Sequence, residues 1–183
     1  MDGRVEIMLS AERIAVRVRE LGALIARDYA QRDLVVVCVL KGSFVFAADL
    51  ARAIHLPLRI DFLGVRSYGE GTESSGVVQI TQDLSRPIEN EDVLLVEDIV
   101  DTGLTVAHLV DLLRTRAPRS VRTCALLHKP SRARVAVAID YVGFTIDDRF
   151  VVGYGLDFAE RYRNLPFIGV LASTAAEGAA PVE

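Results

Sequence analysis

Short, continuously apolar runs alternate along this chain with longer stretches in which apolar residues recur every three or four positions. The runs predict strands over residues 34–40, 58–65, 77–83, 93–96, 121–127, 135–142 and 150–153, and the periodic stretches predict helices over residues 10–30, 44–54 and 105–116. Apolar runs such as LVVVCVL (34–40) are typical of strands that are covered on both faces, as parallel sheets require. Strands that alternate with helices therefore predict an α/β fold with a mainly parallel central sheet flanked by helices.

Two polar segments interrupt this pattern. Residues 66–76 (RSYGEGTESSG) contain three Gly and three Ser without apolar periodicity, which predicts a loop, either a mobile lid or a surface hairpin. Residues 172–183 are mostly small and include Gly and Pro, which predicts a disordered tail. The sequence contains no internal repeat and no linker, so we expect one domain over residues 1–171.

Composition excludes several classes of protein. With 51% hydrophobic and 25% charged residues among 183, the chain can bury enough surface to fold, so it is not intrinsically disordered. No apolar run approaches the roughly 18 residues that cross a bilayer, and the N-terminus MDGRVEIML lacks the apolar core of a secretory signal. A net charge of −4 argues against a protein that coats nucleic acid. Cys38 and Cys124 lie in apolar runs without CxxC spacing, so we expect reduced core thiols and a cytoplasmic location.

The densest polar cluster follows the predicted strand 93–96. Glu97 and Asp98 come first, and the run DTGLT (101–105) then leads into a predicted helix. In open α/β sheets, ligands bind beyond the carboxyl ends of the strands, and two carboxylates there need a cation or hydroxyl groups as partners. Gly103 allows a tight turn, and the free N–H groups of the helix favour a phosphate. The cluster points to a phosphorylated sugar with Mg2+, unless Asp-Thr-Gly is only a helix cap beside a solvated strand end.

The run VLLVEDIVDTGLT (93–105) resembles the signature of the type I phosphoribosyltransferases, which bind phosphoribosyl pyrophosphate. Further segments are similar to one branch, the bacterial-type hypoxanthine or hypoxanthine-guanine phosphoribosyltransferases: VLKGSFVFAADL, DFLGVRSYGEGTESSG, LLHKPSR and DYVGFTIDDRFVVGYGLDFAERYRNLPFIGVL. The resemblance covers about residues 5–171 and implies the type I phosphoribosyltransferase fold, with a mobile lid loop and a small C-terminal hood. It also implies purine salvage, in which hypoxanthine or guanine and phosphoribosyl pyrophosphate give IMP or GMP and pyrophosphate.

The resemblance assigns roles to the cluster after residue 96. Glu97 and Asp98 would hold the ribose hydroxyls, with Mg2+ bridging ribose and pyrophosphate. Five consecutive residues would cradle the 5′-phosphate: Asp101, Thr102, Gly103, Leu104 and Thr105. Asp101 would also be the catalytic base that takes the purine N7 proton as N9 bonds to the sugar. Leu104 departs from relatives that carry a basic residue at this place, so the affinity for phosphate would be weaker while the backbone cradle is kept.

Pyrophosphate would be bound by a second loop. Lys41 and Gly42 match the family's pyrophosphate loop, in which the peptide bond equivalent to Leu40–Lys41 is cis, and Arg163 would also contact the pyrophosphate. Judged without the family, the alternative for Lys41 is a simple cation at a strand end. The chain has only two lysines among 21 basic residues, and both fall at proposed contacts, Lys41 here and Lys129 at the purine.

The lid and the metal complete the implied site. Ser67 and Tyr68 would lie at the reactive tip of the lid, which excludes water from an oxocarbenium-like sugar. Glu97, Asp98 and Asp157 are the candidate carboxylates for Mg2+, Asp157 through water.

Purine recognition would fall to the C-terminal part of the chain. Phe150 would stack on the base, Val151 would offer backbone contacts, and Asp157 would lie near the exocyclic group. Lys129 would donate to the purine 6-oxo oxygen, although some relatives place this lysine near residues 136–138, where this chain has none. Two alternatives stay open, a core position for Phe150 and a solvated turn position for Lys129.

Other functions are compatible with the same fold. A non-catalytic regulator that binds nucleotides is one alternative, and a xanthine-preferring phosphoribosyltransferase is another. The resemblance implies small-molecule partners only, with neither nucleic acid nor membrane, and a homodimer or homotetramer.

Overall fold

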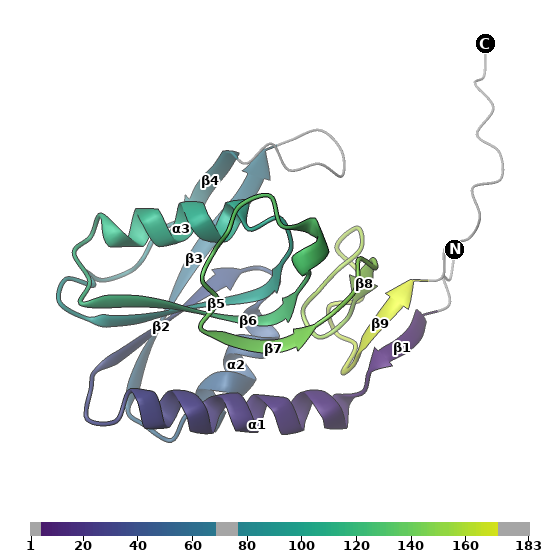
Figure 1. Ribbon diagram of the computed structural model, residues 1–183, viewed down its shortest axis with the longest axis horizontal. Coiled ribbons are helices and arrows are strands. Elements are labelled where there is room, and N and C mark those ends of the chain that lie inside the picture. Colours follow the sequence, from purple (N-terminus) through teal and green to yellow (C-terminus); the bar gives the residue numbers. More distant parts are fainter. Residues whose placement is uncertain (1–4, 69–76, 172–183) are drawn as a thin grey trace, which may run out of the picture.

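The computed structural model describes residues 5–68 and 77–171 (Figure 1). Its strands are β1 (Val5–Leu9), β2 (Leu34–Leu40), β3 (Leu58–Tyr68), β4 (Val77–Gln82), β5 (Asp92–Val100), β6 (Ser120–His128), β7 (Tyr141–Thr145), β8 (Val151–Val152) and β9 (Ile168–Leu171). Its helices are α1 (Ala11–Asp28), α2 (Phe44–Ala53), α3 (Leu104–Arg114) and the short 3-10 helix η1 (Pro130–Arg132). None of the helices described is long and apolar enough to span a membrane.

Six strands form the central sheet in the order β4-β3-β2-β5-β6-β7, in which β4 is antiparallel and the others are parallel. Helices α1 and α2 cover one face and α3 covers the other (Figure 1). Strand β2 shows why its sequence is continuously apolar: Val36 and Cys38 join the core under α1 and α2, while Val35 and Val37 join the core under α3. The predicted parallel α/β architecture is confirmed.

A second, antiparallel sheet has the order β1-β9-β8. It combines the N-terminal strand with residues of the expected C-terminal hood, and it lies beside one end of the central sheet (Figure 1). The sequence pattern predicts neither β1 nor β9, because they are only 5 and 4 residues long and depend on each other for pairing.

The predicted strand over residues 135–142 is wrong. Strand β7 covers Tyr141–Thr145, and no strand is assigned to residues 133–140. The reason is that Arg134 and Val135 donate their N–H groups to the carbonyl oxygen of Thr102 instead of to a neighbouring strand. The alternating apolar residues of this segment still pack, since Val137 and Ile139 contact the core under α3.

The predicted strands over residues 58–65 and 77–83 correspond to β3 and β4, which pair antiparallel as a hairpin. The predicted loop begins too early: residues 66–68 belong to β3, where Ser67 pairs with Val78 and Tyr68 with Val77. The rest of the expected lid, residues 69–76, and the expected tail, residues 172–183, lie outside the described residues.

Candidate functional site

The carboxyl ends of β2, β5 and β6 meet at one edge of the central sheet, where predicted site residues gather. Gly42, just after β2, lies so close to Asp98 of β5 that a methyl group at Gly42 would overlap the Asp98 carboxylate. The N–H group of Lys129, just after β6, donates to the carbonyl oxygen of Val100 at 2.9 Å. Parallel strands place their carboxyl ends together, so residues that are distant in the sequence converge here.

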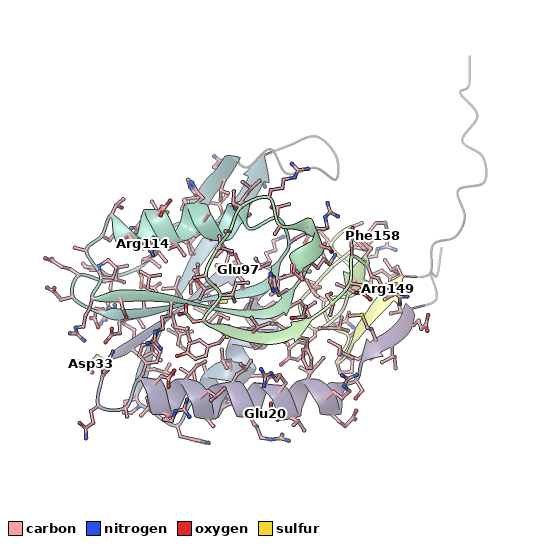
Figure 2. The ribbon with its side chains drawn as sticks, viewed as in Figure 1. Glu20, Asp33, Glu97, Arg114, Arg149 and Phe158 are labelled. Atoms are coloured by element: carbon pink, nitrogen blue, oxygen red, sulfur yellow. The ribbon has the colours of Figure 1, made fainter. Side chains whose placement is uncertain are left out.

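The two carboxylates at the end of β5 lie inside the strand rather than after it, because β5 extends to Val100. Glu97 is buried and lies near the middle of the molecule (Figure 2). Burial, and then the neighbouring Asp98, raises the pKa of Glu97 well above its ordinary value.

Asp98 is partly buried, and burial raises its pKa to about 6. The N–H group of Ile99 donates to Asp98 Oδ1 at 2.8 Å and opposes this shift. Arg163 also lowers the pKa of Asp98, whereas Asp157 raises it, so both residues of the C-terminal segment act electrostatically on β5. A cation or hydroxyl donors that reach Glu97 and Asp98 would offset the cost of burying their charge.

The turn between β5 and α3 has the features of an anion site. Gly103 has a φ of 81°, and a Cβ atom there would lie 2.8 Å from the carbonyl oxygen of Val135, so the turn requires glycine. Leu104 donates its N–H group to Thr102 Oγ1 at 3.4 Å and begins the helix, one residue earlier than predicted. The N-cap residue Gly103 has no side chain that could cap α3, so the N–H groups that follow Leu104, near Thr105, are suited to a phosphate.

Asp101 lies in the same turn and forms an ion pair. Its Oδ1 atom has almost no exposed surface and lies 3.1 Å from Arg132 Nε. Arg132 is the last residue of η1, and Lys129 directly precedes that helix. The expected base is therefore in contact with the segment that carries the expected purine-reading lysine.

The predicted pyrophosphate residues come together through two acidic residues. Lys41, whose peptide bond with Leu40 is cis as the resemblance implies, places its Nζ atom 2.9 Å from Glu160 Oε2. Arg163 Nη2 lies 2.8 Å from Asp157 Oδ1 and 3.7 Å from Glu160 Oε1. Two cations from separate loops thus converge on the Glu160 carboxylate.

A glycine allows the C-terminal segment to approach the loop that contains Lys41 and Gly42. Gly155 has a φ of 102°, and a methyl group there would overlap the carbonyl oxygen of Gly42. The carbonyl oxygen of Gly155 accepts a hydrogen bond from Arg163 Nη1 at 2.8 Å. This close approach brings the expected purine-binding segment and the expected pyrophosphate loop into direct contact.

The two open alternatives for the purine residues are both wrong. Lys129 is not a solvated turn cation, since only 6% of it is exposed, and its Nζ atom lies 3.6 Å from Asp148 Oδ1. Phe150 is not a core residue, since 55% of it is exposed, and its ring meets that of Phe158 edge-on with the centroids 5.6 Å apart. Figure 2 shows Phe158 near β8 and β9. Val151 is buried as the first residue of β8, where it pairs with Val170.

Sequence reasoning missed four residues at this site: Arg132, Asp148, Phe158 and Glu160. Arg132 lies in the short 3-10 helix η1 and the other three lie on irregular segments, where no periodicity marks a residue that faces a ligand. Glu160 and its neighbours Ala159 and Tyr162 have positive φ values of 62°, 51° and 75°, which no residue-type pattern in FAERY indicates. One signal was available, because Asp148 and Glu160 both lie in segments that carry the family resemblance.

The chain matches the family model described as "Phosphoribosyl transferase domain" over residues 5–159. It is 51% identical over 171 residues to the hypoxanthine-guanine phosphoribosyltransferase of Mycobacterium tuberculosis, covering 90% of this chain and 85% of that one. It is 49% identical to the enzyme of the same name from Dictyostelium discoideum, covering 91% and 94%.

A solved structure agrees with these matches. The hypoxanthine phosphoribosyltransferase of Staphylococcus aureus superposes with a TM-score of 0.88 at 48% identity and covers 91% of each chain. The fold, the loop after β5 and the sequence matches lead to one conclusion: the chain belongs to the phosphoribosyltransferase family, within the branch of the hypoxanthine-guanine phosphoribosyltransferases.

Proposed function

We propose that this protein transfers the 5-phosphoribosyl group of phosphoribosyl pyrophosphate to hypoxanthine and guanine, and thereby serves purine salvage. The observation that carries this proposal is the convergence of Gly42, Asp98, Asp101 and Lys129 at one edge of the sheet. These residues supply, in one place, groups suited to a diphosphate, a ribose, a purine proton and a purine oxygen.

The sugar would be held by the end of β5 and the turn that follows. Glu97 and Asp98 would accept hydrogen bonds from the ribose hydroxyls, and this pairing would compensate for their burial. Five residues would surround the 5′-phosphate with N–H and hydroxyl donors: Asp101, Thr102, Gly103, Leu104 and Thr105. Leu104 has no polar side chain to contribute, so the cradle would depend on the helix terminus and its neighbours.

Pyrophosphate would be bound by Lys41, the backbone at Gly42 and Arg163. The Nε atom of Arg163 is buried and has no hydrogen-bond partner among the described residues. Pyrophosphate oxygens would displace Glu160 from the two cations, because they carry more charge than one carboxylate.

Mg2+ fits the donor set as an ion that arrives with the substrate. Within the described residues no three or more potential ligands are grouped as a protein-built metal site, whereas Mg2+ commonly binds one or two carboxylates together with substrate phosphates. Asp98 would be such a carboxylate, with Glu97 and Asp157 as further candidates. The bound ion would neutralise charge on the leaving pyrophosphate.

Proton transfer would be the role of Asp101. The C1′–N9 bond forms as the bond from C1′ to the pyrophosphate oxygen breaks, and the purine N7 proton passes to the Asp101 carboxylate. Lys129 would donate to the 6-oxo oxygen and disfavour a 6-amino group. Phe150 would stack on the purine, since its ring is more than half exposed and is supported by Phe158.

Further residues would complete the substrate site. Val151 and Asp157 would contact the purine edge, and Ser67 and Tyr68 would belong to a lid that closes over the sugar. We expect a cytoplasmic enzyme that assembles as a homodimer or homotetramer.

A panel of purines tests this function. The purified protein is incubated with phosphoribosyl pyrophosphate, Mg2+ and either hypoxanthine, guanine, xanthine or adenine, and nucleotide formation is followed. We expect turnover with hypoxanthine and guanine and none with adenine. Fastest turnover with xanthine would change the substrate assignment, and nucleotide binding without turnover would indicate a regulator instead.

A further inference from the structure

Asp148 lies between two cations of the site, although the proposed reaction gives it no role. Its Oδ1 atom is 3.6 Å from Lys129 Nζ and 3.5 Å from Arg132 Nη1. Arg132 in turn lies 3.1 Å, through Nε, from Asp101 Oδ1. The four side chains form a row of alternating charge that runs from the expected purine-reading lysine to the expected base.

The lysine in this row depends on its partner. The side chain of Lys129 is only 7% exposed, and a buried ammonium group is costly unless an opposite charge lies beside it. Among the residues the structure describes, Asp148 is the ion-pair partner of Lys129. A lysine ammonium group sits on a flexible stem with three rotatable donors, so the partner decides where it points.

The arginine depends on the same carboxylate. Arg132 contacts Asp148 through one arm of the guanidinium group and Asp101 through Nε. Because the guanidinium group is planar and rigid, fixing Nη1 also fixes the direction of Nε. Asp148 is 51% exposed and comes from the loop between β7 and β8, an element separate from those of both cations.

We propose that Asp148 is a positioning residue that sets purine specificity. It holds the Lys129 ammonium group toward a 6-oxo purine, and through Arg132 it keeps the Asp101 carboxylate oriented toward purine N7. The inference rests on the proposed function, because it uses the roles given there to Lys129 and Asp101. Without this carboxylate the ammonium group loses its direction, and the preference for a 6-oxo over a 6-amino purine weakens.

The chain offers a matched control for the test. Asp147 is the neighbouring carboxylate, and no side-chain ion pair or hydrogen bond involves it within the described part of the chain. Asp148→Asn, Asp147→Asn and the conservative Asp148→Glu are compared with the wild type by steady-state kinetics. Both KM values are measured, for hypoxanthine and for phosphoribosyl pyrophosphate, together with kcat and turnover of adenine.

We expect Asp148→Asn to raise the KM for hypoxanthine about tenfold, the loss typical of one hydrogen bond or ion pair to a charged group. The KM for phosphoribosyl pyrophosphate should stay within about twofold, since the ion pairs of Asp148 are with Lys129 and Arg132, which the proposed function does not assign to that substrate. The ratio of kcat/KM for hypoxanthine over adenine should fall. Asp148→Glu should recover most of the loss, and Asp147→Asn should behave as the wild type.

Two results would overturn the inference while leaving the proposed function intact. One is an active wild type whose Asp148→Asn variant keeps its KM for hypoxanthine. The other is an equal change of both KM values, which would indicate general disruption of the site. A wild-type protein that turns over no purine would instead overturn the proposed function, and this inference with it.

Discussion

Two pairs of carboxylates border the site: one pair is buried on a strand, and the other forms ion pairs on a loop. Glu97 and Asp98 lie on a central strand, where burial raises both pKa values. Asp157 and Glu160 lie on an irregular loop, where Arg163 and Lys41 compensate their charge at 2.8 and 2.9 Å. A cation or hydroxyl donors would offset the burial of the strand pair. The loop pair is already matched by two cations, and under the proposed function these cations would exchange Glu160 for pyrophosphate.

The strand side should carry the chemistry, so the largest effect is expected there. Asp101→Asn removes the group that accepts the N7 proton, and we expect kcat to fall by about 10²- to 10⁴-fold. The side chain keeps its size, so the affinity for phosphoribosyl pyrophosphate should change little. Single-turnover kinetics combined with equilibrium binding separates the two quantities, and equal losses in both would contradict the role of Asp101 as the base.

The contact between the pyrophosphate loop and the strand can be broken directly. Gly42→Ala forces the Asp98 carboxylate to rotate away, and we expect kcat/KM to fall by about 10- to 100-fold, as for a small misplacement of a binding group. The control is the same change in an Asp98→Ala background, where the clash is absent and little further loss is expected. Additive effects of the two substitutions in this cycle would show that the contact has no influence.

The strand pair should also make stability depend on pH. The folded-state pKa of Asp98 is about 6 against 3.8 ordinarily, so between about pH 4 and 6 the folded state binds more protons than the unfolded state. Stability from this group therefore falls as pH rises through that window. Asp98→Asn should raise the free energy of unfolding at pH 7 by about 1–3 kcal/mol and flatten its pH dependence.

Denaturant unfolding of the free protein at pH 4.5 and pH 7 measures this effect. Catalytic activity should decrease in the same variant, because a stabilising change at a binding site commonly costs function. Lower stability of Asp98→Asn than of the wild type at pH 7 would show that the Asp98 charge is favourable in the fold.

The loop pair should respond weakly. Lys41 and Glu160 are each about two-thirds exposed, and such pairs contribute roughly 0–1 kcal/mol, so Glu160→Gln should leave the free energy of unfolding almost unchanged. Removing the competing carboxylate should tighten binding of pyrophosphate with Mg2+ by about two- to fivefold, within that energy range. Titration calorimetry measures this, with Glu89→Gln as a control outside the site. Weaker pyrophosphate binding by Glu160→Gln would contradict competition for the two cations.

The comparison also explains how much the sequence can predict. The strand side follows from local pattern: β2 is predicted to the residue, and the polar residues that follow the apolar start of β5 mark the site. The prediction for β5 is too short, because this central strand pairs with β2 and β6 and continues through Glu97 and Asp98.

The contacts of the loop that carries Asp157 and Glu160 cannot be predicted from local sequence pattern. Glu160 has a positive φ that its residue type does not indicate, and its contact with Lys41 joins residues 119 positions apart. Likewise, Val135 lies in an alternating pattern that predicts a strand, yet its N–H group donates to the carbonyl oxygen of Thr102 and not to a neighbouring strand. The family resemblance points to Arg163 and Asp157 but gives no role to Asp148, and a lone carboxylate between Leu156 and Phe158 is the one local signal for Asp157.

The most direct measurement is to quantify the products that the wild-type protein forms from hypoxanthine and phosphoribosyl pyrophosphate in the presence of Mg2+. Phosphorus NMR detects the phosphorylated products, and proton NMR detects the purine. We expect IMP and pyrophosphate to form in a 1:1 ratio without ribose 5-phosphate, because the proposed site would direct the sugar to the base and exclude water. Formation of ribose 5-phosphate in place of IMP, or binding of both substrates without any product, would contradict the account.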